Sequence, residues 1–139
     1  GDFDWTRRTF RWTTVAAVGC ALIGSATVAL AFRPIGELWL SATPVASTFL
    51  LSGFVVWCVL EAAGNSIAAL LNAASILRYQ VLTSLLFAVT CFVAKMWAVA
   101  HLGTDWVPWT TSATYLLATG VPLALFWRTL RSDIRNGRY

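Results

Sequence analysis

The sequence predicts an all-α membrane protein, a polytopic bundle of about four transmembrane helices. The first observation is composition: 58% of the 139 residues are hydrophobic and only 12% are charged, where a soluble domain carries about 25%. The second is distribution, because the apolar residues form runs of roughly 20 residues, the length that an α-helix needs to cross a ~30 Å hydrocarbon core. The third is that these runs lack the period-two alternation of a membrane β-barrel.

The basic residues are distributed as expected for a membrane protein. Eight of the ten Lys and Arg residues fall before the first run, between the second and third, or after the fourth: Arg7, Arg8, Arg11, Arg78, Arg128, Arg131, Arg135 and Arg138. With four spans, these places share one side of the membrane, and the other side holds Arg33. Because cytoplasmic segments carry the excess of Lys and Arg, both ends of the segment are predicted to be cytoplasmic. Topology thus accounts for the net charge of +4, and no nucleic acid partner is expected.

The first span is predicted at about residues 12–33. Small residues recur in it every four positions, at Ala17, Ala21, Ser25 and Ala29. This spacing predicts a stripe on which another helix packs closely. Arg33 and Pro34 are predicted to end the helix, and Trp39 is predicted to lie in the outer loop that follows.

The second span is predicted over residues 44–75, with Pro44 in the first turn, where its missing N–H costs nothing. About 32 residues at ~1.5 Å each extend about 48 Å, more than a bilayer needs. The helix is therefore expected to tilt or to protrude into the cytoplasm. A break at Gly64-Asn65 would instead give two shorter helices, and the single helix is the preferred interpretation.

The third and fourth spans are predicted at residues 79–101 and 108–130. A short turn joins the second span to the third, so these two are expected to form an antiparallel hairpin. Gly120 and Pro122 lie in the middle of the fourth span. Because a proline there removes a backbone hydrogen bond, the pair predicts a kink and a candidate hinge.

Two charged residues lie inside the predicted spans, Glu61 in the second and Lys95 in the third. Each is 17 positions from Arg78 in the turn, so an antiparallel hairpin would hold them at one depth. A carboxylate and an ammonium at one depth on adjacent helices can pair, which lowers the cost of placing either in lipid. The sequence predicts that they form a buried ion pair or line a polar cavity. The alternative for Lys95 is that its side chain extends outward to the membrane surface.

Two amides lie toward the cytoplasmic end of the second span. Asn65 and Asn72 are seven positions apart, which puts them on one face of a helix. They are candidates to hydrogen-bond a polar headgroup, and the simpler interpretation is that they bond another helix.

Signals for enzymes and metal sites are missing from the sequence. The three cysteines, Cys20, Cys58 and Cys91, lie within apolar spans and are interpreted as small packing residues. The sequence has no Cys-x-x-Cys pair and only one histidine, so no metal and no cofactor are expected. It has no Gly-rich phosphate loop and no His-Glu-x-x-His, and we expect a protein that is not an enzyme.

The chain begins with Gly1, its only methionine is Met96, and it shows no signal peptide. We therefore expect residues 1–139 to form a single membrane domain that is a piece of a longer protein. The small-residue stripe of the first span is expected to find partners among the remaining helices of that longer chain.

Several short segments carry a resemblance by their order and spacing. They are Asp4-Trp5-Thr6-Arg7-Arg8-Thr9, Leu38-Trp39, the Ala-x-x-x-Asn stretch from Ala68 to Asn72, Leu77-Arg78-Tyr79-Gln80 and Leu102-Gly103. A final helix with a basic tail follows. Over almost its full length the chain resembles the last third of bacterial polysaccharide biosynthesis proteins of the O-antigen flippase kind, in the multidrug/oligosaccharidyl-lipid/polysaccharide exporter superfamily.

The resemblance implies a transporter of about twelve helices, of which these are the final four. Such proteins have two six-helix bundles around a central cavity and alternate access to move lipid-linked oligosaccharide, a lipopolysaccharide precursor, across the bacterial cytoplasmic (inner) membrane. Basic side chains in the cavity are thought to meet the pyrophosphate of this substrate, and here Arg33 and Lys95 hold suitable positions. Arg33 alternatively caps the outer end of the first span.

Two other functions stay open on the sequence. One is a small proton-coupled drug exporter that uses Glu61 as its proton carrier. The other is a membrane anchor or assembly subunit of four helices that transports nothing, which would leave Glu61 without a role.

Overall fold

The computed structural model describes residues 3–40, 46–73 and 77–125, and this part of the chain is helical with no strands. The elements in chain order are α1 (Phe3–Leu40), α2 (Thr48–Ala73), α3 (Leu77–His101), the 3-10 helix η1 (Thr104–Trp106), α4 (Val107–Tyr115) and the π-helix η2 (Leu116–Gly120). Residues 121–125 continue helically after η2. The predicted all-α class is confirmed for these residues.

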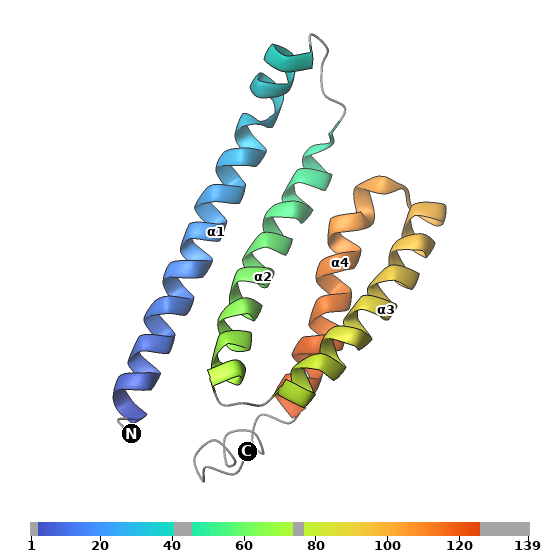
Figure 1. Cartoon of the computed structure of the whole chain (residues 1–139). Helices are drawn as coiled ribbons and strands as arrows, with labels where there is room; N and C mark the ends of the chain where they lie inside the picture. Colours follow the sequence, from blue (N-terminus) through green and yellow to red (C-terminus); the bar gives the residue numbers. More distant parts are fainter. Residues whose placement is uncertain (1–2, 41–45, 74–76, 126–139) are drawn as a thin grey trace.

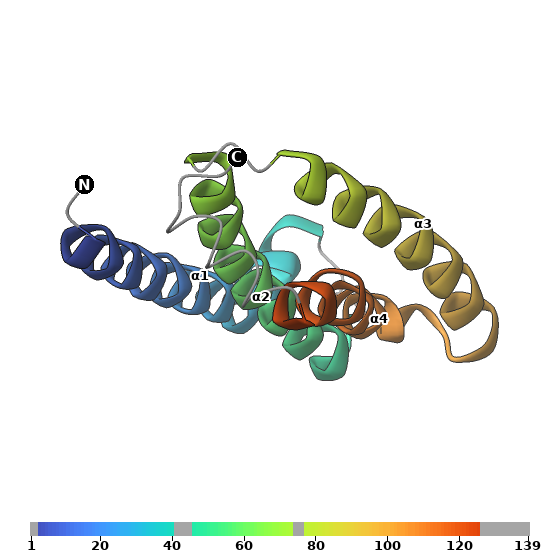
Figure 2. The ribbon, with the colours of Figure 1, turned by 90° about the horizontal axis from the view of Figure 1, so that it is seen from below.

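The helices form an open row in the order α1, α2, α4, α3 (Figure 1). α1 packs along α2, and α4 packs against both α2 and α3, whereas α2 and α3 contact each other only slightly. Seen from below, the row does not close on itself (Figure 2). α2 and α3 run antiparallel, but they are not the close neighbours that the predicted hairpin requires, because α4 occupies the space between them.

α1 is longer than the predicted first span at both ends. It has 38 residues and passes through Pro34 to Leu40, so the prediction that Arg33 and Pro34 end the helix is wrong. Pro34 removes the one hydrogen bond that its N–H would give to the carbonyl of Leu30. Because the loss falls near the end of the helix, the remaining backbone bonds continue it for six more residues, and exposed Trp39 belongs to the helix and not to a loop.

The predicted small-residue stripe of α1 faces α2. Ser25 is buried, and Ala17, Ala21 and Ala29 are half-buried, while the large residues around them are exposed. The hydroxyl of Ser25 donates to the carbonyl oxygen of Ala21 at 2.6 Å, which satisfies it inside the interface. Small side chains along this line let the two backbones approach closely.

α2 is one continuous helix from Thr48 to Ala73, without a break at Gly64-Asn65. The preferred interpretation of a single helix therefore agrees with the structure. Ser47 begins it as the N-cap, because its side-chain oxygen accepts a hydrogen bond from the backbone N–H of Leu50 at 3.0 Å. Pro44, predicted to lie in the first turn, is outside the described residues.

α3 ends in a tight turn that reverses the chain into α4. The N–H groups of Leu102 and Gly103 both donate to the carbonyl oxygen of Ala98, at 2.7 and 3.0 Å. Gly103 has a φ of 94°, a left-handed conformation that a residue with a Cβ rarely adopts. The turn leads directly into η1, so that α4 returns along α3.

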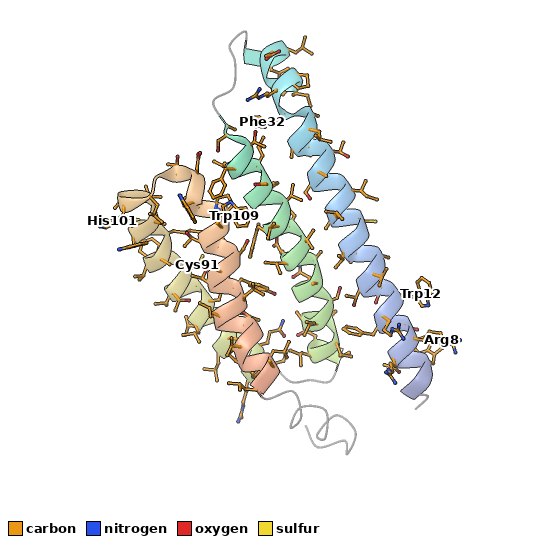
Figure 3. The ribbon with its side chains drawn as sticks, turned by 180° about the vertical axis from the view of Figure 1, so that it is seen from behind. Arg8, Trp12, Phe32, Cys91, His101 and Trp109 are labelled. Atoms are coloured by element: carbon orange, nitrogen blue, oxygen red, sulfur yellow. The ribbon has the colours of Figure 1, made fainter. Side chains whose placement is uncertain are left out.

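Burial is inverted relative to a soluble domain. The buried side chains among the described residues are mostly small or hydroxylic: Ser25, Leu71, Thr83, Cys91, Ala98, Thr111, Ser112 and Ala118. Large apolar residues such as Trp12, Leu30 and Trp39 are exposed, and Figure 3 shows Trp12 directed away from α2. Helices that associate in lipid pack through small residues and leave their large apolar side chains to the lipid chains.

Three helical segments are long and apolar enough to cross a membrane: Trp5–Trp39, Thr48–Ala73 and Leu77–His101. The predicted fourth span, 108–130, corresponds to α4, η2 and residues 121–125, and its remainder lies outside the described residues. A fourth crossing therefore stays a prediction.

The helices differ in charge between their two ends, taken along the helix axes. At one end lie Arg7, Arg8 and Arg11, in the first turns of α1, and Arg78, in the first turn of α3 (Figure 1). The opposite end, called the η1 end below, holds Asp105 together with Arg33 and Glu37 of α1. The arginines from Arg128 to Arg138 lie outside the described residues.

Candidate functional site

The η1 end of α2 and α4 is held by aromatic rings from both helices. Phe49 of α2 stacks on Trp109 of α4 with ring centroids 5.4 Å apart and meets Trp106 edge-on at 5.1 Å. The indole Nε1 of Trp109 donates to the backbone oxygen of Phe49 at 3.1 Å. We call Phe49, Trp106 and Trp109 the outer ring cluster, and it fixes the separation of α2 and α4 at this end.

Gly53 allows this close approach. A Cβ at this position would lie 2.7 Å from Nε1 of Trp109 and 3.1 Å from the Cβ of Pro108. A residue with a side chain would therefore push α4 away from α2. Next to the cluster, the hydroxyl of Ser47 donates to a carboxylate oxygen of Asp105 at 2.5 Å, which ties the start of α2 to η1.

A second group of rings joins α2, α3 and α4 nearer the middle of the row. Trp57 of α2 and Phe87 of α3 are stacked at 6.1 Å, and Tyr115 of α4 meets them edge-on at 5.4 and 5.3 Å. We call these residues the central triad. Each helix contributes one ring, and every ring contacts the other two, so the triad joins α2, α3 and α4.

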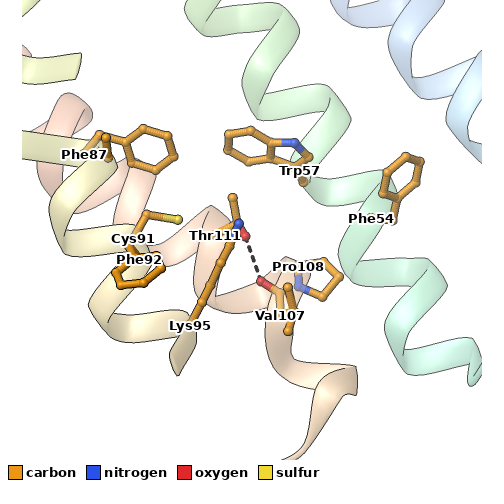
Figure 4. A pocket seen from close by; sticks show the side chains of 10 residues that line it. Phe54, Trp57, Phe87, Cys91, Phe92, Lys95, Val107, Pro108 and Thr111 are labelled. Carbon is orange, nitrogen blue, oxygen red and sulfur yellow. Dashed lines mark hydrogen bonds between the residues drawn. The ribbon is translucent and has the colours of Figure 1, made fainter. Parts of the chain in front are cut away.

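Between the outer ring cluster and the central triad lies a cavity of about 460 Å³ (Figure 4). Most of its wall is aromatic or aliphatic, and four of its side chains carry a nitrogen, oxygen or sulfur atom: Trp57, Cys91, Lys95 and Thr111. The lining residues are Phe54, Trp57, Phe87, Ala88, Cys91, Phe92, Lys95, Val107, Pro108 and Thr111. Its size falls in the range of small-molecule sites, which are mostly apolar with a few polar groups.

Lys95 is the charged residue of this cavity. Its side chain extends from α3 into the space between α3 and α4 (Figure 4). The nearby hydroxyl of Thr111 donates to the carbonyl oxygen of Val107 at 2.7 Å. Among the described residues, no carboxylate lies within ion-pair distance of the Lys95 amino group. The position of Lys95 in a mainly apolar cavity favours an anionic group there as its counter-ion.

The predicted ion pair between Glu61 and Lys95 is not formed. Glu61 is exposed on α2 and does not line the cavity. The prediction assumed that equal distance from the turn makes the two helices neighbours. Since α4 lies between α2 and α3, equal depth does not bring the two side chains together. Lys95 does line a cavity, as the second form of the prediction stated, but the cavity is mainly apolar and excludes Glu61.

The remaining predicted pathway residues lie away from the cavity. Arg33 is exposed on α1, which packs on α2 and lines no part of the cavity. Asn65 and Asn72 are exposed on α2. Neither makes a hydrogen bond through its side chain to the part of the chain that the structure describes. Their predicted contacts with a headgroup or another helix stay predictions.

The predicted kink at Gly120 and Pro122 coincides with a π-helical turn. η2 covers Leu116–Gly120, and the N–H of Val121 donates to the oxygen of Leu116, five residues earlier. Pro122 has no N–H, and in an α-helix its ring would collide with the carbonyl of Ala118. The wider turn removes that collision. Whether this turn acts as a hinge stays a prediction.

The described residues contain no cluster of metal-binding side chains. In residues 3–40, 46–73 and 77–125, no three His, Cys, Asp or Glu side chains gather at a metal-binding distance. The three cysteines are free thiols. The groups of the cavity that could contact a ligand are the amino group of Lys95, the aromatic rings and the hydroxyl of Thr111.

Sequence reasoning missed the central triad and the contact between Ser47 and Asp105. A signal for the triad existed, because Trp57 and Tyr115 lie in the middle of apolar runs, whereas membrane Trp and Tyr usually lie at the interfaces. A polar aromatic residue in mid-run indicates an internal contact. The partner of Ser47 carried no such signal, because it is 58 positions away.

Comparison of the chain with protein-family models, with curated proteins and with solved structures found no match. Fold and site together define an all-helical protein with three helices long and apolar enough to cross a membrane. In the described part of this chain, a cavity lined by one lysine lies among α2, α3 and α4.

Proposed function

We propose that this chain is part of a transporter that flips lipid-linked oligosaccharide across the bacterial cytoplasmic membrane by alternating access. Its partners would be membrane lipid, the oligosaccharide substrate and further helices of a longer protein. The η1 end would face the outside, and the arginine-rich end would face the cytoplasm.

The observation that carries the proposal is the unpaired ammonium of Lys95 in a ring-lined cavity. A lipid-linked oligosaccharide offers three matching features: a pyrophosphate, sugar rings and an apolar chain. The pyrophosphate would supply the counter-charge that Lys95 lacks. The rings of Trp57, Phe54 and Phe92 would contact the apolar faces of sugars or the lipid chain.

The open row of helices supports the proposal independently of the cavity. α1 and α3 lie at the two ends of a row that does not close, and exposed large apolar side chains line it. One side of such a row would face lipid and the other would face further helices, as in half of a two-bundle transporter.

The test is complementation of a bacterium that lacks its own O-antigen flippase with the full-length gene. Lys95→Gln, which removes the charge and leaves a polar side chain one atom shorter, is expected to lower surface polysaccharide about tenfold, as the loss of about 1.4 kcal/mol of binding free energy would do. Lys95→Arg should retain most activity. Arg33→Gln is the matched control, because Arg33 lies outside the cavity.

Restored polysaccharide with this ranking of variants would support the proposal. Failure of well-expressed wild-type protein to restore polysaccharide, with several repeat-unit types tried, would contradict it. In that case a drug-resistance assay would test the small exporter, and absence of both activities would favour the anchor or assembly subunit.

A further inference from the structure

One side of α2 changes from aromatic to polar halfway along the helix. Toward the η1 end, Phe54 and Trp57 line the cavity. Toward the arginine-rich end, Glu61, Asn65 and Asn72 are exposed. At about 100° per residue, these five positions fall within about 80° of one another around the helix axis. The aromatic and the polar residues therefore occupy one continuous side of α2.

This side lies beside the contact of α2 with α4. Gly53 and Gly64 mark that contact, since a Cβ at either position would meet a ring of α4. Both glycines lie about 80° around the helix from the middle of the side just described. The polar residues therefore border α4 without being covered by it.

The polar residues of α2 have no partner in the part of the chain that the structure describes. The carboxylate of Glu61 and the amides of Asn65 and Asn72 form no hydrogen bond or ion pair with the described residues. Lipid chains offer neither donors nor acceptors, so three such groups on one side of a helix are unsuited to face hydrocarbon. They require water, a polar ligand or polar groups of another helix beside them.

α3 shows the same change on the side that faces the cavity. Ala88 and Lys95 line the cavity, and Ser84 lies one turn before Ala88, toward the arginine-rich end. Ser84 is exposed, and its hydroxyl makes no hydrogen bond with the described residues. The hydroxyls of Thr83 and Thr90, in contrast, bond carbonyl oxygens of their own helix. Because α2 and α3 run antiparallel (Figure 1), the free polar groups of both helices lie beyond the same end of the cavity.

The charges give the cavity and the polar residues different ligand preferences. Lys95 favours a phosphate in the cavity. The carboxylate of Glu61, one turn beyond the cavity wall at Trp57, accepts hydrogen bonds and repels a second anion. The amides of Asn65 and Asn72 both donate and accept. Sugar hydroxyls also donate and accept and carry no charge, so the combination suits sugar units joined to a phosphate.

We infer that Glu61, Asn65 and Asn72 of α2, with Ser84 of α3, form a sugar-binding face that continues the Lys95 cavity toward the arginine-rich end. Sugar hydroxyls of the oligosaccharide bind there while the pyrophosphate lies at Lys95. The sugars follow directly on the pyrophosphate in such a lipid, so one molecule reaches both places. The inference rests on the proposed function and adds where the sugar portion of the substrate binds.

Binding of two lipid probes to the full-length protein in nanodiscs tests the inference. One probe is a short polyprenyl pyrophosphate that carries the sugar repeat unit of the complemented strain, and the other is the same polyprenyl pyrophosphate without sugar. The double variant Asn65→Ala/Asn72→Ala is expected to bind the sugar-bearing probe about tenfold more weakly, because it loses two hydrogen-bonding side chains. It should bind the sugar-free probe as wild type does.

Two further variants serve as references. Ser52→Ala is the matched control, because that exposed serine lies on the opposite side of α2 and should leave both affinities unchanged. Lys95→Gln is expected to weaken the binding of both probes, which distinguishes the pyrophosphate site from the sugar-binding face. The unfolding free energy of each variant is measured alongside, and that of the double variant should equal that of wild type.

The outcomes separate the inference from the proposed function. Equal weakening of both probes by the double variant, or no weakening of either, overturns the sugar-binding face while binding of polyprenyl pyrophosphate still stands. A lower unfolding free energy of the double variant, with unchanged affinity for both probes, also overturns it, because the amides would then contact another helix. Wild-type protein that binds neither probe contradicts the proposed function itself.

Discussion

The two halves of the contact between α2 and α4 are built differently. At the η1 end, a serine–aspartate hydrogen bond, an indole N–H bond and the outer ring cluster fix the helices through groups that point at each other. Toward the other end, the contact rests on Tyr115 against Gly64, and α4 widens into a π-turn. The comparison shows that polar and aromatic groups fix α4 at the η1 end, whereas a single close contact and a π-helical turn follow at the other end, called the adjustable half below because the predicted hinge would lie there.

The largest effect is expected from Gly64→Ala in the adjustable half. The new Cβ would overlap the Tyr115 hydroxyl, so ring or helix must shift. Overpacking of this kind costs about 1–3 kcal/mol, measured as the free energy of unfolding of the full-length protein in mixed micelles. Gly24→Ala on α1 is the control, because its Cβ would meet nothing within 4 Å.

A second variant shows whether the overlap with the hydroxyl is the cause. Tyr115→Phe removes the oxygen that a Cβ at Gly64 would meet, and it should recover part of the stability that Gly64→Ala loses. Equal loss with and without the hydroxyl would show that the close contact does not set the helix separation.

A smaller loss is expected from Ser47→Ala at the anchored end. The change removes the N-cap of α2 and its bond to Asp105, at a cost of about 1 kcal/mol. Ser52→Ala is the matched control, because that exposed hydroxyl bonds only the carbonyl of Phe49 within its own helix. If Ser47→Ala and Ser52→Ala lower the free energy of unfolding equally, the contact between Ser47 and Asp105 does not anchor this end of the helices.

Pro122→Ala should alter shape more than stability. Without the proline ring, residues 116–120 can return to α-helical bonding, which rotates the following residues by about 100°. Spin labels at Ala113 and Ala124, both exposed, would report a changed distance by electron paramagnetic resonance. Pro108→Ala, in the first turn of α4, should leave that distance unchanged; an unaltered distance in both variants would show that Pro122 does not cause the π-turn.

The smallest effect is expected from Asn72→Ala. This amide is exposed and bonds nothing in the described chain, so the unfolding free energy should change by less than about 0.5 kcal/mol. A larger loss of unfolding free energy would indicate that Asn72 contacts a helix outside the described residues.

The helices themselves could be predicted from the sequence, because a spanning helix is recognised from the length and hydrophobicity of its own segment, without knowing which helices it contacts. The same holds for Lys95, since a charge inside such a run is conspicuous wherever it points. The order of the helices could not be predicted in this way. It depends on the burial of Thr111 and Ser112 of α4 and of Ala118 of η2, and small residues occur on several faces of every run.

The end of α1 shows that a strong local signal in the sequence can also give a wrong prediction. Arg33-Pro34 is a strong local signal for a helix end, yet the helix continues to Leu40, because one missing bond near a terminus is a small loss. Gly120 and Pro122 lie at a π-helical turn, which the sequence did not predict, and the predicted kink and hinge stay predictions. A proline permits a bend, a register shift or a π-turn, and the backbone on both sides selects among them.

The inverted burial described above has a thermal consequence. Unfolding of a soluble domain transfers apolar surface into water, and the resulting large heat-capacity change curves its stability with temperature. When these helices separate, Ser25, Ala98 and their neighbours exchange protein contacts for lipid chains, not water. The heat capacity of helix separation should therefore be small, so that the stability of the row falls almost linearly on heating and shows no cold denaturation.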